Sequence, residues 1–391
     1  KPVIAAGLVI FIIGSLVAAQ ADHIAWLIVG RLLQGAGAIG AAVLALVADL
    51  TREAVRTRAM ALIGMTIGVS FAISLVLGPT LEHWIGVPGI FWLTAGLSVG
   101  AIIALYAVVP TPEAVQHHRD AQLTPGLLAD LLRNPHLLRL DFGIFALHFI
   151  LTAVFVVVPP LLVREAGLAT AQQWQLYLPV MLASFVLMFP LVFIAEARRR
   201  MKGVFAAAVG GLVVALAWLA GGYTGLGLLG VQLLVFFTAF NVLEATLPSL
   251  VSKTAPAGAK GTAMGLYNMA EFFGAFLGGM LGGALSGTYG AEGVFWMGAA
   301  LAGVWLVWTL VAPPPQYLAT RLLHVAGVDE GEALELEGTL ARVDGVMEAR
   351  VFADEGTAYC KVDSQRLDEA GLEAALQWAR AEAGAEARPE G

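Results

Sequence analysis

The sequence predicts an all-α polytopic membrane protein, with ten helices present of an expected twelve, followed by a small α+β domain. Composition is the first observation: of 391 residues, 59% are apolar and 13% are charged, and the mean hydropathy is +0.80. An average soluble domain carries about 25% charged residues, so a water-soluble globule is excluded. Charge distribution is the second: the net charge is +2 up to residue 312 (15 Lys and Arg, 13 Asp and Glu) and −9 beyond it (7 and 16).

Ten long apolar segments are the third observation. A bilayer core requires about 20 apolar residues for each helix, and each segment is close to that length or longer. The predicted spans are 2–20, 24–48, 59–80, 89–109, 141–163, 173–195, 203–222, 225–250, 261–286 and 292–312.

The loops between these spans predict the orientation in the membrane. One alternating set of loops holds 13 Lys and Arg residues, whereas the other set holds only Arg164. Basic loops stay on the cytoplasmic side, so we expect a multi-pass protein of the plasma (inner) membrane with both ends of this chain in the cytoplasm. No basic footprint for nucleic acid is present.

An internal repeat of 204 residues connects the two halves of the body. Residues 59–62 (AMAL) match residues 263–266 (AMGL), and residues 77–81 (LGPTL) match residues 281–285 (LGGAL). Parallel repeats of this kind are typical of transporters built from two homologous halves. Residues 141–312 hold six spans and residues 2–109 hold four, so we expect two further spans to precede Lys1.

These patterns predict the organisation of the whole chain. Residues 1–112 form the remainder of an N-terminal bundle, 113–140 a central cytoplasmic loop, 141–312 a C-terminal bundle of six spans, 313–317 a linker, 318–381 a cytoplasmic α+β domain and 382–391 a disordered tail.

Polar side chains inside the spans are the candidate functional residues, because an ionised group at the bilayer centre costs about 2.5–3.5 kcal/mol. We expect proton coupling by Arg31, Glu244 and Glu271. Alternatives remain open: Arg31 can extend to the interface, and each glutamate can be a neutral hydrogen-bonded group that joins helices. The expected substrate cavity is lined by Gln34, His148, Tyr177, Asn241, Tyr267 and Asn268.

Several motifs resemble those of the major facilitator superfamily. The segment 30–37 (GRLLQGAG) is similar to that family's fourth-helix motif, and the resemblance implies a proton-coupling role for Arg31. Gly78 and Pro79 match the core of the fifth-helix antiporter motif. Residues 196–202 (EARRRMK) resemble a degenerate second copy of the signature loop. Gly78, Pro79, Glu196 and Arg200 are therefore expected to form conformational motifs. Asp49 ends the second span just before a basic loop, and it is expected to be either an ion-pair latch that opens and closes with conformation or an end-of-helix charge.

The acidic tail strengthens this resemblance. Its pattern predicts a strand, a helix, a hairpin and a second helix, which form a two-layer α+β sandwich. YajR-like transporters of the superfamily carry a small ferredoxin-like cytoplasmic domain, and the chain resembles that group over essentially its whole length. Related metal-carrier domains need a pair of thiolates, but Cys360 is the chain's single cysteine. We therefore expect no metal and no cofactor.

The predicted function is a proton-coupled secondary transporter that exports a small amphipathic molecule or drug by alternating access. Its expected partners are that small molecule, protons and the lipid bilayer, and the cytoplasmic domain is expected to contact the transporter body or a second copy. The alternative is a channel, or a membrane receptor or sensor regulated by the cytoplasmic domain. An enzyme is not expected, because no nucleophile–base pair or metal-ligand cluster is recognisable within the spans.

Overall fold

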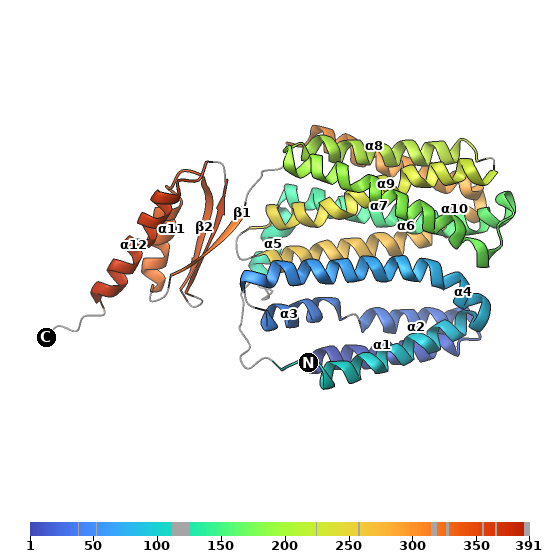
Figure 1. Cartoon of the computed structure of the whole chain (residues 1–391), viewed down its shortest axis with the longest axis horizontal. Helices are drawn as coiled ribbons and strands as arrows, with labels where there is room; N and C mark the ends of the chain where they lie inside the picture. The colour runs from blue at the N-terminus through green and yellow to red at the C-terminus, as the bar shows by residue number, and fades with distance from the viewer. Residues whose placement is uncertain are drawn as a thin grey trace. The chain divides into compact units, whose positions relative to one another are not determined.

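The computed structural model describes residues 1–37, 39–51, 53–111, 125–223, 225–256, 259–313, 319–325, 328–353, 356–363 and 366–386. Figure 1 labels its helices and strands. The chain divides into two compact units. Unit 1 comprises residues 1–117, 158–183 and 224–234, and unit 2 comprises residues 118–157, 184–223 and 235–391.

Four helices make up most of unit 1. They are α1 (Pro2–Ala19), α2 (Ile24–Ala36), α3 (Gly40–Leu50) and α4 (Glu53–Ala107). Helices α1 and α2 pack with their backbones in close contact at two glycines. A Cβ atom added to Gly14 would lie 2.6 Å from the carbonyl oxygen of Gly30, and one added to Gly30 would lie 2.7 Å from the carbonyl oxygen of Gly14. Small residues at such crossings allow membrane helices to approach closely.

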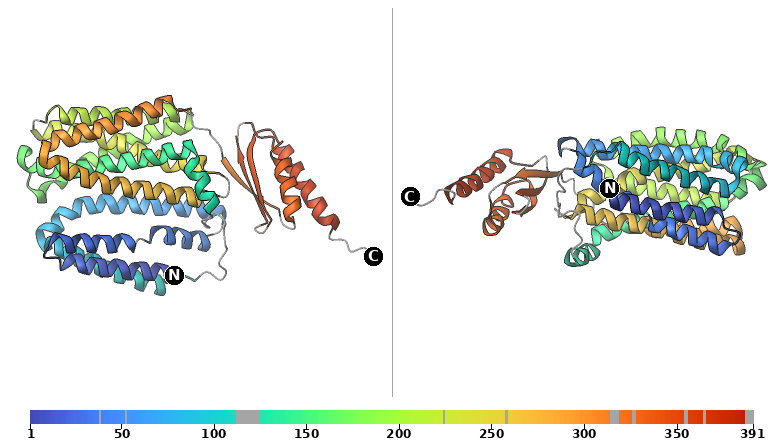
Figure 2. Two further views of the ribbon diagram at one scale, coloured as in Figure 1. Left: turned by 180° about the vertical axis from the view of Figure 1, so that it is seen from behind. Right: turned by 90° about the horizontal axis from the view of Figure 1, so that it is seen from below.

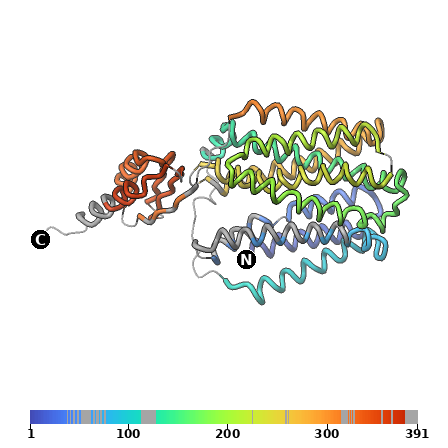
Figure 3. The backbone as a smooth tube through the Cα atoms, turned by 45° about the horizontal axis from the view of Figure 1, so that its top comes forward, coloured from blue at the N-terminus to red at the C-terminus, as the bar shows by residue number. Residues whose placement is uncertain are grey.

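The remaining helices of the membrane body follow the central loop. They are α5 (Pro125–Arg133), α6 (Pro135–Ala166), the 3-10 turn η2 (Thr170–Gln172), α7 (Trp174–Ala197), α8 (Met201–Ala220), α9 (Gly225–Thr254) and α10 (Lys260–Val311). The second half of α10 runs beside α8 (Figure 3). There the fully buried ring of Trp305 meets the ring of Phe205 edge to face, with 5.8 Å between their centroids.

Two helices are broken at glycines, and the breaks follow the sequence repeat. Gly86 interrupts α4 with φ 66° and ψ 172°, and Gly290 interrupts α10 with φ 67° and ψ −167°. A side chain would disfavour this positive-φ conformation. The numbers 86 and 290 differ by 204, the same interval as the repeat, so the two halves share a backbone break as well as sequence.

The predicted spans coincide with helices, but α4 and α10 each carry two of them and one predicted span is divided. Seven helices among the described residues are long and apolar enough to cross a membrane, and one of them covers 51 residues of α10. At 1.5 Å per residue, 51 helical residues would extend about 77 Å, which is far more than one bilayer core. The break at Gly290 therefore separates the predicted spans 261–286 and 292–312, and the break at Gly86 separates 59–80 from 89–109.

The second predicted span is not one helix. Residues 24–48 divide into α2 and α3, which are separated after Gly37. Three glycines lie within six residues there, at positions 35, 37 and 40, and glycine disfavours a helix by about 1 kcal/mol per residue relative to alanine. A Cβ atom on Gly37 would also lie 2.5 Å from the carbonyl oxygen of Gly7 in α1, so this position requires glycine.

The C-terminal part of the chain forms the predicted α+β layers. Three strands, β1 (Ala319–His324), β2 (Val346–Phe352) and β3 (Thr357–Val362), pair antiparallel in the order β1-β3-β2. Helices α11 (Glu330–Leu340) and α12 (Glu369–Glu386) cover the same face of this sheet (Figure 2). The core between the layers contains Leu336, Leu340, Cys360, Val362 and Leu372, all buried. The order βαββα was predicted from the sequence and is confirmed.

Candidate functional site

Unit 2 contains a cluster of one histidine and two glutamates from three different helices. His148 lies on α6, Glu244 on α9 and Glu271 on α10. The imidazole Nε2 of His148 is 3.4 Å from Oε1 of Glu271. One ligand atom from each of the three residues lies within 4.8 Å of the others. We call these three residues the His–Glu–Glu cluster.

A stripe of glycines on α10 explains why His148 and Glu271 meet. Cβ atoms added to Gly274 and Gly278 would overlap the backbone carbonyl oxygens of Phe145 and Phe149 on α6. A Cβ atom on Gly282 would lie 2.9 Å from Cα of Ala153, one turn further along α6. The two helices are therefore in backbone contact over several turns, and His148 lies on α6 within this interface.

Hydrogen bonding within the cluster is incomplete. Oε2 of Glu244 is buried and has no hydrogen-bond partner among the described residues, whereas the imidazole of His148 lies near the backbone carbonyl of Ile144 one turn earlier on α6. The carboxyl groups of Glu244 and Glu271 interact electrostatically with each other. Buried polar atoms are nearly always hydrogen-bonded in native proteins, so this unpaired oxygen is a candidate for contact with a proton, an ion or a substrate.

Three further predicted cavity residues lie on the same helices. Tyr267 is 2% exposed, and its hydroxyl has no hydrogen-bond partner in the described part of the chain. It interacts electrostatically with Glu244 and Glu271. Asn268 follows it on α10 and is half-buried. Asn241 is buried on α9 and donates from Nδ2 to Oγ of Ser184 on α7 at 2.9 Å.

A second polar group lies in unit 1, where Arg31 and Gln34 share one face of α2. Nη1 of Arg31 donates to Oε1 of Gln34 at 2.6 Å. Nε2 of Gln34 donates to Oγ of Ser15 on α1 at 2.7 Å, and that hydroxyl donates to the carbonyl oxygen of Phe11 at 2.8 Å. Gln34 and Ser15 are buried, whereas Arg31 is exposed. We call these residues the Arg–Gln–Ser chain.

The structure places the other predicted residues of unit 1 separately. Tyr177 is buried on α7, with 3% of its surface exposed. Gly78 and Pro79 lie within α4, and a Cβ atom on Gly78 would meet no atom within 4 Å. Asp49 belongs to α3, and its side chain lies outside those described.

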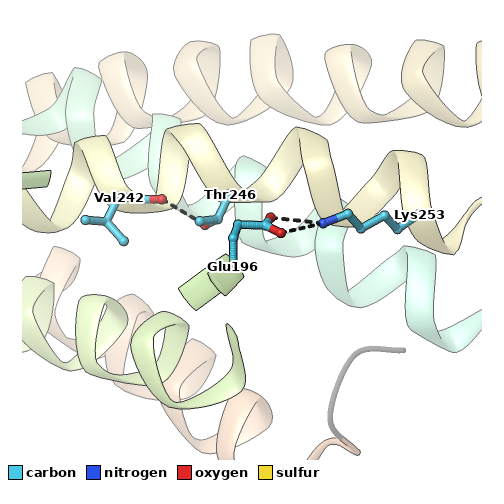
Figure 4. Close-up of polar contacts among 4 residues, drawn as sticks. All are labelled: Glu196, Val242, Thr246 and Lys253. Atoms are coloured by element: carbon cyan, nitrogen blue, oxygen red, sulfur yellow. Dashed lines mark hydrogen bonds and ion pairs between the residues drawn. The ribbon is translucent and has the colours of Figure 1, made fainter. Parts of the chain in front are cut away.

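The predicted motif at residues 196–202 places Glu196 in an ion pair with α9. Nζ of Lys253 lies 2.9 Å from Oε1 and 3.0 Å from Oε2 of Glu196 (Figure 4). Two turns before Lys253 on α9, Thr246 donates from Oγ1 to the carbonyl oxygen of Val242 at 2.8 Å. Arg200 is the N-cap residue of α8, and its backbone N–H donates to the carbonyl oxygen of Ala195 at 3.1 Å.

Sequence reasoning missed two partners in these groups. Ser15 completes the Arg–Gln–Ser chain, and Ser184 accepts the hydrogen bond from Asn241. Each is a serine inside an apolar span, and serine hydroxyls in spans commonly form hydrogen bonds between helices. The neighbouring Gly14 permits the close approach of α2, so a small residue beside Ser15 was the feature of the sequence that could have predicted this hydrogen bond.

Comparisons with known proteins give the same assignment. A family described as the Major Facilitator Superfamily matches residues 1–279. An inner membrane transport protein of Escherichia coli, YajR, is 42% identical over 380 residues, which cover 97% of this chain and 83% of the relative. An uncharacterized transporter from Buchnera aphidicola is 29% identical over 277 residues, or 71% of each protein.

A solved structure with the same fold is a bacterial homolog of the human lysosomal transporter Spinster, in an inward-facing and occupied conformation. It aligns with a TM-score of 0.58 and 14% identity over 78% of this chain and 80% of that chain. The apolar helices, the 204-residue repeat and these matches point to a multi-pass membrane transporter. The chain belongs to the Major Facilitator Superfamily.

Proposed function

We propose that this transporter is a proton-coupled secondary antiporter of the inner membrane that exports a small amphipathic molecule by alternating access. The observation that carries the proposal is the His–Glu–Glu cluster. Among the residues that the structure describes, no Lys or Arg forms an ion pair with Glu244 or Glu271. The nearest basic group in that part of the chain is the imidazole of His148, which contacts Glu271 alone of the two glutamates. Two carboxylates in apolar surroundings are costly to ionise together, and the proton is the coupling ion that we propose.

The magnitude of the repulsion supports this assignment. The ligand atoms of the cluster all lie within 4.8 Å of one another, and two unit charges at that largest separation repel by about 3 kcal/mol at an effective dielectric constant of roughly 20. Binding of one proton to the glutamate pair removes this repulsion, and release of the proton restores the repulsion. The energy is large enough to bias a two-state transporter, since coupling free energies of about 1–3 kcal/mol are typical.

Arg31 is proposed as the second coupling element, in the other half of the transporter. Its guanidinium is held by Gln34, and the resemblance to the fourth-helix motif supports the role. The proposed direction of transport is export. It is supported by Gly78 and Pro79, which match only the core of the antiporter motif. We also propose that both ends of this chain are cytoplasmic, as the basic loops indicate.

The C-terminal α+β domain is proposed to contact the transporter body. Nζ of Lys361 on β3 lies 3.0 Å from the backbone carbonyl oxygen of Lys253, and Nη2 of Arg199 lies 3.7 Å from Oδ1 of Asp363. Lys253 is also the partner of Glu196. The domain would then influence the cytoplasmic ends of α7 and α9.

Replacement of each glutamate by glutamine tests the coupling proposal. Glutamine keeps the size and hydrogen bonding of the side chain but cannot carry a proton. We expect at least one of Glu244→Gln and Glu271→Gln to abolish uphill transport of an amphipathic dye, ethidium, in vesicles with an imposed proton gradient, while downhill exchange continues. Glu165→Gln is the control, because Glu165 is exposed at the end of α6.

The contrary result is equally clear. If both variants accumulate the dye like the parent protein between about pH 6 and 8, neither glutamate carries the coupling proton. If the parent protein does not transport ethidium either, the result contradicts the proposal that the substrate is an amphipathic molecule of this kind.

A further inference from the structure

We propose that His148, Glu244 and Glu271 form a binding site for one divalent transition-metal ion of the zinc class. The three side chains come from α6, α9 and α10, and one ligand atom of each lies within 4.8 Å of the others. The site lies entirely within unit 2. The proposal goes beyond proton coupling, because it concerns a second kind of cation at the same carboxyl groups.

The spacing between two of the ligands fits a metal better than a hydrogen bond. Nε2 of His148 and Oε1 of Glu271 are 3.4 Å apart, beyond the 2.7–3.2 Å usual for an N–H···O hydrogen bond. Zinc binds imidazole nitrogen at about 2.0–2.1 Å and carboxylate oxygen at about 2.0–2.2 Å, so neighbouring ligand atoms of a tetrahedral site are about 3.4 Å apart. This pair is already at the separation that zinc requires.

Glu244 supplies the third ligand. Its Oε2 is buried and has no hydrogen-bond partner in the described structure. The separation of up to 4.8 Å exceeds the tetrahedral edge by about 1.4 Å. Rotation of the glutamate about its terminal torsion, which is broad and weakly restricted, is enough to close this gap.

Charge and ligand chemistry favour the same occupant. Two carboxylates and one dication sum to zero, which removes the cost of unpaired charge in apolar surroundings. One imidazole with two carboxylates is a donor set that zinc and related ions accept, whereas calcium and magnesium take oxygen ligands alone. Tyr267, which is 2% exposed with an unpaired hydroxyl, interacts electrostatically with both glutamates. The fourth coordination position is open to water or to this hydroxyl.

Zinc binding to the full chain tests the proposal without any transport assay. The protein is purified in detergent, any histidine tag is removed, and bound Zn²⁺ is measured by equilibrium dialysis with elemental analysis. We expect one Zn²⁺ per chain. His148→Ala and Glu271→Gln each remove a ligand, so affinity should fall by at least about tenfold, since loss of even a ligand's outer partner costs 10–100-fold.

Matched controls separate a specific site from general weakening. His136→Ala and Glu165→Gln remove the same chemical groups at positions outside the cluster, and both should bind Zn²⁺ like the parent. The d–d spectrum of bound Co²⁺ provides a second readout, which should change in His148→Ala if imidazole is a ligand. Monodisperse size-exclusion profiles for all four variants confirm that folding is retained.

The proposal is overturned if the parent binds no Zn²⁺ above the His148→Ala level, or if the control variants lose as much affinity as the cluster variants. Its failure is distinguishable from failure of proton coupling. A protein that pumps but binds no Zn²⁺ contradicts only the metal site. A protein that binds Zn²⁺ while both glutamine variants still pump contradicts only the coupling role.

Discussion

The Arg–Gln–Ser chain in unit 1 and the His–Glu–Glu cluster in unit 2 are built on opposite principles. In the first, a cation donates to an amide, the amide to a hydroxyl and the hydroxyl to a backbone carbonyl. In the second, a buried carboxyl oxygen of Glu244 has no partner in the described residues. A complete chain of hydrogen bonds fixes one arrangement, whereas an incomplete cluster requires an occupant. The difference is the reason that we propose the second group as the main site of ion exchange, with Arg31 of the first group as a second coupling element.

The glycine interface that positions the cluster gives the largest expected effect on stability. Gly282 and Gly78 occupy equivalent places in the repeat, but only Gly282 has a neighbour, Cα of Ala153, at 2.9 Å from the added Cβ. Gly282→Ala should lower the free energy of unfolding by about 1–3 kcal/mol through overpacking. Gly78→Ala should be neutral or should stabilise α4 by up to about 1 kcal/mol.

Thermal unfolding of the two purified variants in detergent checks this pair. Equal melting temperatures for Gly282→Ala and Gly78→Ala would contradict the backbone contact between α6 and α10. A second consequence is functional: if Gly282→Ala separates these helices, it should also weaken Zn²⁺ binding, although it removes no ligand.

Replacement of Arg31 should give the next largest effect, a loss of coupling between proton movement and dye transport. Arg31→Ala removes the donor to Gln34 and should lower uphill dye accumulation by about 5–150-fold, the usual range of coupling between sites. Arg31→Lys keeps the charge but loses the planar guanidinium, so it should be intermediate. Insertion and folding should be retained in both, as judged by size-exclusion chromatography. Parent-like accumulation by Arg31→Ala would favour the alternative in which its side chain only extends to the membrane interface.

The ion pair between Glu196 and Lys253 should contribute little to stability. The Glu196 side chain is 43% exposed and that of Lys253 is 28% exposed, and exposed ion pairs are worth about 0–1 kcal/mol. Glu196→Gln should therefore shift the free energy of unfolding by less than about 1 kcal/mol. If the ion pair opens during the transport cycle, the transport rate of this variant should change clearly although its stability does not. A large loss of stability with unchanged transport would contradict this.

Cys360 gives the smallest expected signal. The thiol is fully buried in the core of the α+β domain, and burial raises its pKa to about 11. Because the thiolate is the reactive form and its fraction rises only as pH approaches the pKa, maleimide should not label the folded protein at pH 8. Labelling should appear on unfolding in denaturant. Rapid labelling of the native protein would show that the domain opens.

Most of the fold could be predicted from the sequence, because membrane spans and repeats leave strong local signals. The 204-residue interval anticipated that α4 and α10 share a feature, which proved to be the paired breaks at Gly86 and Gly290. The βαββα order of the C-terminal domain followed from alternation and spacing. The division of residues 24–48 into two helices was missed, since it depends on contact between Gly37 and α1.

The candidate site was only partly predictable. Composition identified His148, Glu244 and Glu271 as polar residues in spans, but no spacing rule connects residues on three helices. Their proximity depends on the approach of α6 to Gly274 and Gly278, which is a tertiary property. For this reason the sequence led us to expect no metal site, although the structure brings three ligand atoms within 4.8 Å.

The most direct test of the account is to measure the proton movement itself. Proteoliposomes that contain a trapped pH indicator receive ethidium without an imposed gradient, and the internal pH is followed for the parent protein and for Glu244→Gln/Glu271→Gln. We predict that dye entry drives protons out of the parent vesicles and that the double variant moves dye downhill without protons. Equal proton movement in both proteins would contradict the claim that the His–Glu–Glu cluster carries the coupling ion.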